Sequence, residues 1–272
     1  MIQEKAYAKL NLTLGVLFKR QDGYHALDTL MTTVSLWDDI IIEKSRQVEV
    51  FTEGASLPFE NTMYKAAMGY KELTGRGALI RCKKRLPAQA GMGGGSADGA
   101  AVLRGLQKLH RLLDDKELAA LALSVGADVP FCLQGGLCRC QGIGEQLTPV
   151  KGPLLHFAVI KPEEGVSTKE LFARLPLPRK RVDTVRAMSL LCSGHIKEAC
   201  PYLQNALEEP ALELVPGIGK IKEALLRQGA MAAAMTGSGS AVFGLFEEES
   251  AARAAVEALG IQYPYAAYCH SV

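Results

Sequence analysis

A glycine-rich stretch, LPAQAGMGGGSADGAA from Leu86 to Ala101, is the first segment of the chain whose residue types predict chemistry. It holds five glycines in sixteen residues and continues as an amphipathic helix pattern. The first N–H groups of a helix have no partner inside the helix, and the helix dipole is positive there, so an anion can bind. Glycine keeps side chains away from that anion. The glycines alone fit a phosphate loop and a structural turn equally well.

Two well-known phosphate-loop patterns do not match this stretch. No lysine follows the glycines, as a Walker loop requires, and Ser96 stands where a dinucleotide-binding fingerprint has its last glycine. If the stretch binds phosphate, loop amides and the helix dipole must carry most of the recognition. The Ser96 hydroxyl can assist, and Asp98 can cap the helix or lie near a magnesium ion.

Three further polar groups stand out, and each has a simpler structural interpretation. Lys9 and Asn11 lie two apart on the polar face of an expected strand, which is typical of a solvated strand face. Asp128, in VGADVPFC, is typical of a turn or cap aspartate. The segment TGSGS, Thr236 to Ser240, is typical of a hairpin loop. Taken one at a time, these simpler interpretations are favoured.

Taken together, the order and spacing of the four groups resemble the GHMP kinase superfamily, which includes galactokinase, homoserine kinase and mevalonate kinase. AYAKLNLTLGVLFKRQDGYHALDTLM is similar to an opening motif of the family, and LPAQAGMGGGSADGAAVLRGL to its phosphate loop. GADVPFCLQGG, GVSTKELF, NALEEPA and MTGSGSAVFGLF follow in the family's order, so the resemblance covers about residues 5 to 246. Ala97, Gly99 and Ser240 depart from the expected pattern, where a hydroxyl residue, an alanine and a proline are typical.

The resemblance implies an ATP-dependent kinase with Mg²⁺ bound through the nucleotide phosphates. It is greatest to the branch that phosphorylates the 2-hydroxyl of a cytidine-diphosphate-linked methylerythritol, a small-molecule substrate of non-mevalonate isoprenoid biosynthesis. Three alternatives remain: a kinase of the same superfamily with another alcohol, a nucleotide-binding protein without turnover, and a structural RNA- or protein-binding domain. The near-neutral charge makes the last the weakest.

The resemblance also implies a role for each matching residue. Asp128 would accept or orient the proton of the substrate hydroxyl, Lys9 would supply positive charge, and Asn11 would hydrogen-bond Asp128 or the hydroxyl. The nucleotide would be bound by Pro87, Ala88, Gln89, Ala90, Gly91, Met92, Gly93, Gly94, Gly95, Ser96, Ala97, Asn61 and Lys65. The substrate, with its cytosine ring against Tyr24 and His25, would be bound by Tyr24, His25, Thr168, Phe172, Gly237, Ser238 and Gly239. No protein-held metal is expected.

Strand and helix patterns interleave in both halves of the chain, which predicts an α+β fold of two domains. Period-two alternation predicts a strand over residues 5–14, and Asp22-Gly23 predicts a turn. The apolar segments LMTTVSLW, DIIIEK and QVEVFTE are expected to be further strands. A helix is expected at Asn61 to Gly75, with Asn61 as its N-cap and Gly75 as its C-terminal stop. Further helices are expected after the glycines, at DDKELAALALSVG, and at about 168–174, 182–192, 195–207, 217–228 and 249–259, with irregular chain at ADVPFCLQGG. The family resemblance implies an N-terminal ATP-binding domain at 1–151, similar to domain 2 of ribosomal protein S5, and a C-terminal substrate-side domain at 152–272, similar to ferredoxin.

Composition sets the outer limits. The chain has 272 residues, 48% hydrophobic and 22% charged, with a net charge of +2, which fits a globular protein and gives no argument for a nucleic-acid or membrane surface. It shows no apolar run near the ~18 residues of a membrane span and no leader pattern, so we expect a cytoplasmic location. The seven cysteines and five histidines have no spacing typical of a metal site, and Cys138 and Cys140 are expected to be strand residues.

Overall fold

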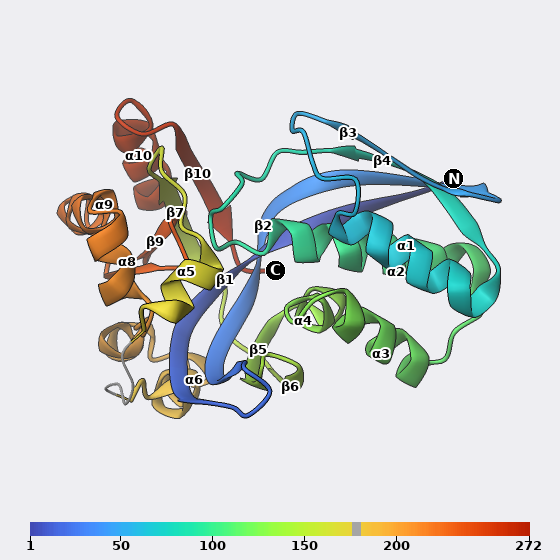
Figure 1. The fold of residues 1–272 in the computed structure, drawn as a ribbon. Helices are drawn as coiled ribbons and strands as arrows, with labels where there is room; N and C mark the ends of the chain where they lie inside the picture. The colour runs from blue at the N-terminus through green and yellow to red at the C-terminus, as the bar shows by residue number, and fades with distance from the viewer. Residues whose placement is uncertain (176–180) are drawn as a thin grey trace. The chain divides into compact units, whose positions relative to one another are not determined.

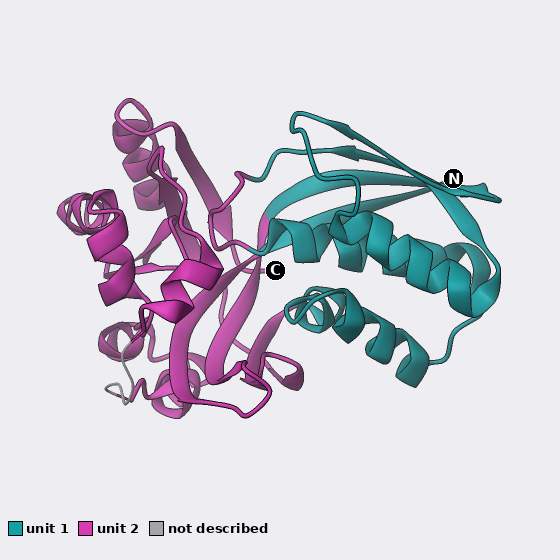
Figure 2. Cartoon of the chain, in the orientation of Figure 1, with its two compact units in different colours: residues 1–8, 36–86, 93–135 teal, residues 9–35, 87–92, 136–272 magenta. Residues whose placement is uncertain are grey.

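A computed structural model describes residues 1–175 and 181–272 of the chain (Figure 1). The chain forms two compact units (Figure 2). Unit 1 contains residues 1–8, 36–86 and 93–135, and unit 2 contains residues 9–35, 87–92 and 136–272. Both units combine strands with helices, which confirms the predicted α+β class. The predicted boundary between residues 151 and 152 stays a prediction.

The chain begins with two long strands, β1 (Ile2–Lys19) and β2 (His25–Ser45), which pair with each other. The predicted turn between them is confirmed: Gly23 has a φ of 87° and its N–H donates to the Arg20 carbonyl at 3.2 Å. Sequence patterns divided β2 into two strands, LMTTVSLW and DIIIEK, and this was wrong. The strand continues because Asp38, the polar residue between the two apolar runs, is buried and accepts backbone hydrogen bonds.

Unit 1 contains the second half of β2, which pairs antiparallel with β4, and β4 pairs parallel with β3. The helices α1 and α2 pack against each other, and their apolar side chains form one core with the strands. A Cβ on Gly105 would lie 2.1 Å from Ile42 Cδ1, so this glycine lets α2 lie close to β2. The elements of this unit besides β1 and β2 are β3 (Val48–Glu53), α1 (Thr62–Thr74), β4 (Gly77–Lys83), α2 (Gly94–His110), α3 (Asp115–Val125) and α4 (Val129–Gln134).

Helix ends in unit 1 follow the local chemistry of the sequence, with one correction. Asn61 caps α1 and Gly75, with a φ of 72°, ends it, as predicted. The chain at ADVPFCLQGG was predicted to be irregular, but it contains the short helix α4. The prediction was wrong because Pro130 lies in the first turn, where its missing N–H would have no helical partner in any case.

Unit 2 contains two sets of strands. The first half of β2 pairs antiparallel with β5, and β5 with β6. A separate four-stranded antiparallel sheet has the order β10-β7-β9-β8, and α9 and α10 pack on it around one apolar core. The strands are β5 (Leu137–Gly142), β6 (Gln146–Val150), β7 (His156–Lys161), β8 (Ala232–Met235), β9 (Val242–Phe246) and β10 (Tyr265–His270). The helices are α5 (Thr168–Ala173), α6 (Thr184–Cys192), α7 (Ile196–Ala199), the 3₁₀ helix η1 (Cys200–Tyr202), α8 (Glu208–Leu214), α9 (Gly217–Arg227) and α10 (Glu249–Gly260).

The helix predicted at about 195–207 is wrong in its second half. The chain forms α7 and η1 and then leaves the helix, because its backbone pairs with β1 instead. Leu14 donates its N–H to the Gln204 carbonyl at 2.8 Å and accepts from the Ala206 N–H at 2.8 Å. The helix α8, which starts at Glu208, was not predicted.

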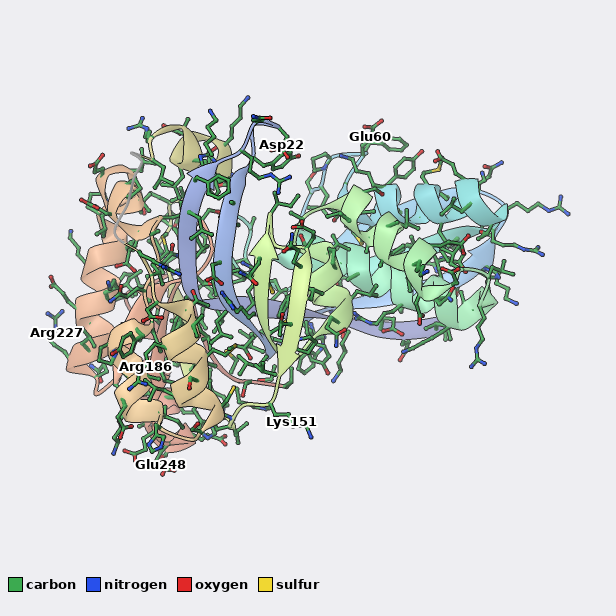
Figure 3. All side chains as sticks on the ribbon, turned by 90° about the horizontal axis from the view of Figure 1, so that it is seen from below. Asp22, Glu60, Lys151, Arg186, Arg227 and Glu248 are labelled. Carbon is green, nitrogen blue, oxygen red and sulfur yellow. The ribbon has the colours of Figure 1, made fainter. Side chains whose placement is uncertain are left out.

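The mixed charges of the surface and the free cysteines agree with what the composition indicates. Charged side chains of both signs, such as Asp22, Lys151 and Arg227, point outward from the ribbon (Figure 3). All seven cysteines are free thiols, and Cys138 and Cys140 lie on β5, as predicted for strand residues. Within residues 1–175 and 181–272, no cluster of three His, Cys, Asp or Glu residues has the arrangement of a metal site, and no helix is long and apolar enough to cross a membrane.

Candidate active site

Lys9 and Asn11 lie on β1 in unit 2, and both are only 4% exposed. The Lys9 ammonium donates a hydrogen bond to Asn11 Oδ1, and Asn11 Nδ2 donates to Thr29 Oγ1 at 2.8 Å. The simpler interpretation of a solvated strand face is therefore wrong for this part of β1. A buried lysine is costly unless polar partners surround it, which is a feature of functional sites.

Two loops of unit 2 approach Lys9 from other parts of the chain. The Lys9 N–H donates to the Met92 carbonyl at 3.0 Å, at the end of segment 87–92. The Asn11 N–H donates to Thr236 Oγ1 at 2.9 Å, and a Cβ on Gly237 would lie 3.1 Å from Lys9 Nζ. The TGSGS segment is thus a hairpin loop between β8 and β9, as its simpler interpretation predicts. It also lies beside the Lys9 ammonium.

Segment 87–92 packs directly against the TGSGS loop. Ser240 donates its N–H to the Gln89 carbonyl at 3.1 Å. Gly91 has a φ of 70°, and a Cβ there would lie 2.0 Å from the Thr236 carbonyl oxygen and 2.8 Å from Gly239 N. Only glycine fits this close approach. The first half of the glycine-rich stretch and the TGSGS loop therefore form one structure in unit 2.

Most of the predicted substrate residues lie in two contacts of unit 2. His25 and Phe172 stack, with ring centroids 4.8 Å apart and an interplanar angle of 27°. Burial and the nearby Lys19 charge lower the pKa of His25. Thr168 Oγ1 and Ser238 Oγ form a hydrogen bond of 2.7 Å that joins the start of α5 to the TGSGS loop. Tyr24 is 59% exposed at the β1–β2 turn. Their roles toward a cytosine ring stay predictions.

The second half of the glycine-rich stretch, residues 93–97, starts helix α2 in unit 1. Gly93 occupies the N-cap position with a φ of 68°, no side chain caps the helix, and the first turn has no acidic residue. Cβ atoms on Gly94 and Gly95 would meet no atom closer than 3.5 Å. The helix thus begins with N–H groups that no side chain caps, and the phosphate role of this loop stays a prediction.

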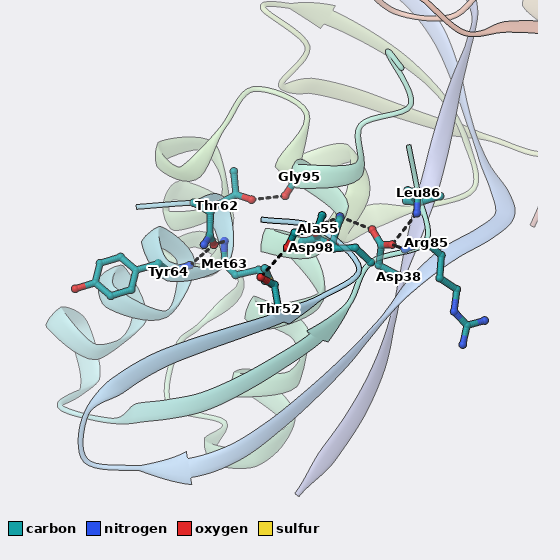
Figure 4. Close-up of polar contacts among 12 residues, drawn as sticks. Asp38, Thr52, Ala55, Thr62, Met63, Tyr64, Arg85, Leu86, Gly95 and Asp98 are labelled. Atoms are coloured by element: carbon teal, nitrogen blue, oxygen red, sulfur yellow. Dashed lines mark hydrogen bonds and ion pairs between the residues drawn. The ribbon is translucent and has the colours of Figure 1, made fainter. Parts of the chain in front are cut away.

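Asn61 and Lys65, the other predicted nucleotide residues, lie at the start of α1 in unit 1. Asn61 Oδ1 accepts from the N–H groups of Met63 and Tyr64 at 3.0 and 3.1 Å, so its simpler role as a helix cap is confirmed. Thr62 Oγ1 donates to the Gly95 carbonyl at 2.5 Å and joins the starts of α1 and α2 (Figure 4). A nucleotide role for Asn61 and Lys65 stays a prediction.

Asp128 immediately precedes α4 in unit 1, and its side chain makes no capping hydrogen bond to that helix. The Asp128 carbonyl accepts from the Cys132 N–H at 3.0 Å, which is the first hydrogen bond of the helix. Asp128 thus lies in a turn at the N-cap position, as its simpler interpretation predicts, and a catalytic role of its carboxylate stays a prediction. The meeting of Asp128 with Lys9, which belongs to the other unit, stays a prediction.

One charged cluster of unit 1 was missed by sequence reasoning. Lys84 Nζ donates to Asp38 Oδ2 at 2.5 Å and to Asp98 Oδ2 at 2.6 Å, and the carboxylates of Asp38 and Asp98 are almost fully buried. Asp38 Oδ1 also accepts from the N–H groups of Arg85 and Leu86 (Figure 4). The cluster joins the end of β4 to the second turn of α2. Asp98 is therefore not a helix cap, because its Oδ2 is paired with Lys84. Its Oδ1 is buried and has no hydrogen-bond partner among the described residues, and a place near magnesium stays a prediction.

Comparison with known proteins agrees with this geometry. The GHMP kinases N terminal domain matches residues 61–136, and the GHMP kinases C terminal domain matches residues 187–264. The fold is thus that of a GHMP kinase, as predicted.

Full-length relatives narrow this class. A 4-diphosphocytidyl-2-C-methyl-D-erythritol kinase of Caldicellulosiruptor saccharolyticus is 43% identical over 267 residues, covering 94% of this chain and 92% of the relative. One of Thermoanaerobacter pseudethanolicus is 38% identical, covering 100% of this chain and 96% of the relative. A crystal structure of 4-(cytidine 5'-diphospho)-2C-methyl-D-erythritol kinase has a TM-score of 0.86 at 36% identity, with 100% of both chains covered. The chain belongs to the 4-diphosphocytidyl-2-C-methyl-D-erythritol kinase family.

Proposed function

We propose that the chain transfers the γ-phosphoryl group of ATP to the 2-hydroxyl of 4-diphosphocytidyl-2-C-methyl-D-erythritol. Family membership supports the reaction, and the observation that carries the site is the buried Lys9 ammonium beside the two glycine loops. Phosphoryl transfer needs little covalent work from the protein. It needs an oxygen nucleophile held in line with the phosphate and positive charge to stabilise the transition state.

In the proposed mechanism, the three predicted catalytic residues divide this work. Asp128 accepts or orients the proton of the substrate hydroxyl, which makes the oxygen a better nucleophile. The Lys9 ammonium neutralises charge on the transferring phosphoryl group and on that oxygen. Asn11 holds Lys9 through its side-chain carbonyl oxygen.

The nucleotide triphosphate is proposed to bind at the uncapped start of α2, where Gly93 to Ser96 present backbone N–H groups. Mg²⁺ takes most of its ligands from phosphate oxygens and water, so one or two protein oxygens suffice. The half-buried Ser96 hydroxyl fits such a role. When bound, Mg²⁺ neutralises charge on the β- and γ-phosphates.

The substrate is proposed to bind in unit 2 along the line from the TGSGS loop to the His25–Phe172 stack. The stacked rings offer an aromatic surface for the cytosine ring. The hydroxyls of Thr168 and Ser238, together with the glycines of the loop, offer polar groups for the diphosphate. We further propose that the protein acts on this small molecule and not on a nucleic acid, and that it is located in the cytoplasm.

An ATP-coupled assay with the cytidyl substrate and a panel of other alcohols tests the reaction directly. Asp128→Asn should lower kcat by about 10²–10⁴-fold, the range of a general base, with ATP affinity nearly unchanged. Asp115→Asn, in the first turn of α3, is the matched control and should keep wild-type turnover. Near-normal turnover in Asp128→Asn would remove this residue from the mechanism, and turnover on another alcohol alone would replace the substrate.

A further inference from the structure

The side-chain amide of Asn11 is held from both ends by buried partners. Its Oδ1 accepts from the Lys9 ammonium, and its Nδ2 donates to Thr29 Oγ1 at 2.8 Å. Thr29, on β2, is 1% exposed. An amide can turn over and exchange its oxygen and nitrogen, so the neighbouring hydrogens decide which end faces Lys9.

The Thr29 hydroxyl requires the same orientation as the Lys9 ammonium, which can only donate. Thr29 Oγ1 lies 2.5 Å from the Thr13 carbonyl oxygen, which can only accept, so the single hydroxyl hydrogen of Thr29 is used there. Thr29 Oγ1 then presents only lone pairs to Asn11 and requires the NH₂ end of the amide. The reversed amide would place two acceptors face to face and would turn its NH₂ group toward the Lys9 ammonium.

The hydroxyl hydrogens of Thr13 and Thr184, farther from the site, are each directed to one acceptor in the same way. Thr184 Oγ1 lies 3.0 Å from the Asp28 carbonyl oxygen, which takes its hydrogen. Thr13 Oγ1, which lies 3.0 Å from Thr184 Oγ1 and accepts from the Leu30 N–H at 2.9 Å, must therefore donate to Thr184. Every hydroxyl hydrogen in this network has one place, so the network has one direction.

We propose that Thr29 is a positioning residue for phosphoryl transfer, which orients the Asn11 amide so that its oxygen holds the Lys9 ammonium. The inference rests on the proposed function, in which that ammonium supplies charge in the transition state. Thr29 acts through Asn11 and has no contact with substrate in this scheme.

Thr29→Val tests the inference, because valine keeps the shape and removes the oxygen. We expect kcat to fall about 10–100-fold, the cost of a poorly held catalytic group, with the KM for ATP within about threefold of wild type. Thr32→Val is the matched control: Thr32 lies on the same strand at 1% exposure, and its hydroxyl donates to the Thr33 carbonyl at 3.3 Å. Its kcat should stay within about threefold of wild type, and so should that of Thr29→Ser, which restores the hydroxyl.

A double-mutant cycle separates positioning from general stability. In an Asn11→Ala background, Thr29→Val should lower kcat no further, because the amide it orients is gone. Three results would each overturn the inference. They are an equal fall of kcat in both backgrounds, a wild-type kcat in Thr29→Val, and a Thr29→Ser variant as slow as Thr29→Val.

If Thr29→Val does not fold, two measurements still decide. Thr29→Ser should keep turnover, and NMR of the wild-type chain should show slow solvent exchange of the Asn11 side-chain NH₂. Fast exchange of that group would overturn the inference. The proposed function fails by other results, namely a wild-type chain that does not phosphorylate the cytidyl substrate or a Lys9→Ala variant with normal kcat.

Discussion

At the scale of single residues, Asp98 shows why some site chemistry cannot be read from sequence. The pattern around it indicates a helix cap or a magnesium neighbour, because it follows the glycines closely. Its partner Lys84 lies 14 residues from Asp98 in the sequence. Asp38, which pairs with the same lysine, lies 46 residues from Lys84. Sequence patterns report neighbours within a helix turn or a strand pair, so they give no signal for such a cluster.

The same limit explains why sequence patterns did not predict that Lys9 and Thr29 are buried. Period-two alternation correctly predicts the β1 strand, but it does not tell that both faces are buried from Ala8 to Val16. By contrast, the Asn61 cap and the Gly75 end of α1 were predicted to the residue, because each depends only on the adjacent backbone.

The Asp98 carboxylate has a consequence for stability against pH. Burial raises its pKa to about 7, with Asp38 adding to the rise and Lys84 opposing it. An unfolded aspartate titrates near ~3.9. Since the folded state holds this proton more tightly, the folded state is favoured below the unfolded pKa. The contribution of Asp98 to the free energy of unfolding therefore falls as pH rises from about 4 to about 7.

Asp98→Asn should remove this dependence, because asparagine is neutral throughout the window. We expect the melting temperature of the variant, relative to wild type, to rise steadily between pH 4.5 and pH 7.5. The change corresponds to about 1–4 kcal/mol in the free energy of unfolding. Thermal unfolding at several pH values measures it, with the exposed Asp115→Asn as control. A difference between variant and wild type that stays constant across the window contradicts the assigned titration.

At the scale of elements, the glycine-rich stretch contains glycines with two different roles. Gly91 is required by the fold, since its φ is positive and the Thr236 backbone occupies the space of a Cβ. At Gly94 a Cβ would meet only Leu86 and Lys84 side-chain atoms, at 3.6 Å or more, which is ordinary contact. The sequence predicted one loop with one purpose, and its pattern of glycines does not distinguish these two positions.

Gly94→Val therefore probes the nucleotide with little disturbance of the fold. We expect the KM for ATP to rise at least about tenfold, because a valine that faces Leu86 and Lys84 would shift the backbone N–H groups at the start of α2 away from a bound phosphate. The melting temperature of Gly94→Val should differ from wild type by only a few degrees, whereas Gly91→Ala should unfold at a much lower temperature than wild type. Initial-rate kinetics and thermal unfolding of both variants make the comparison. An unchanged KM for ATP in Gly94→Val would exclude this loop as the phosphate site.

At the scale of the whole molecule, unit 2 is built from stretches that lie far apart in the sequence. Leu14 and Val16 of β1 share one apolar core with β7, β9 and α9. The Val272 N–H donates to the Thr33 carbonyl at 3.1 Å. Interleaved strand and helix patterns were enough to predict the α+β class, because each element has its own period. Which elements share a core depends on contacts over more than 200 residues, and no local pattern reports those.

This interleaving predicts how the chain behaves when it is cut at the Lys151-Gly152 joint, which is exposed. A protease site inserted there would leave β1 and β2 on one piece and the four-stranded sheet on the other. We expect the cut pieces to elute together in size-exclusion chromatography and to separate only in denaturant, because Leu14 stays paired with Gln204 and Ala206 across the cut. The uncut chain carrying the same insertion is the control. Two pieces that elute apart in native buffer, each with folded circular dichroism, would show that the core of unit 2 does not need its N-terminal strands.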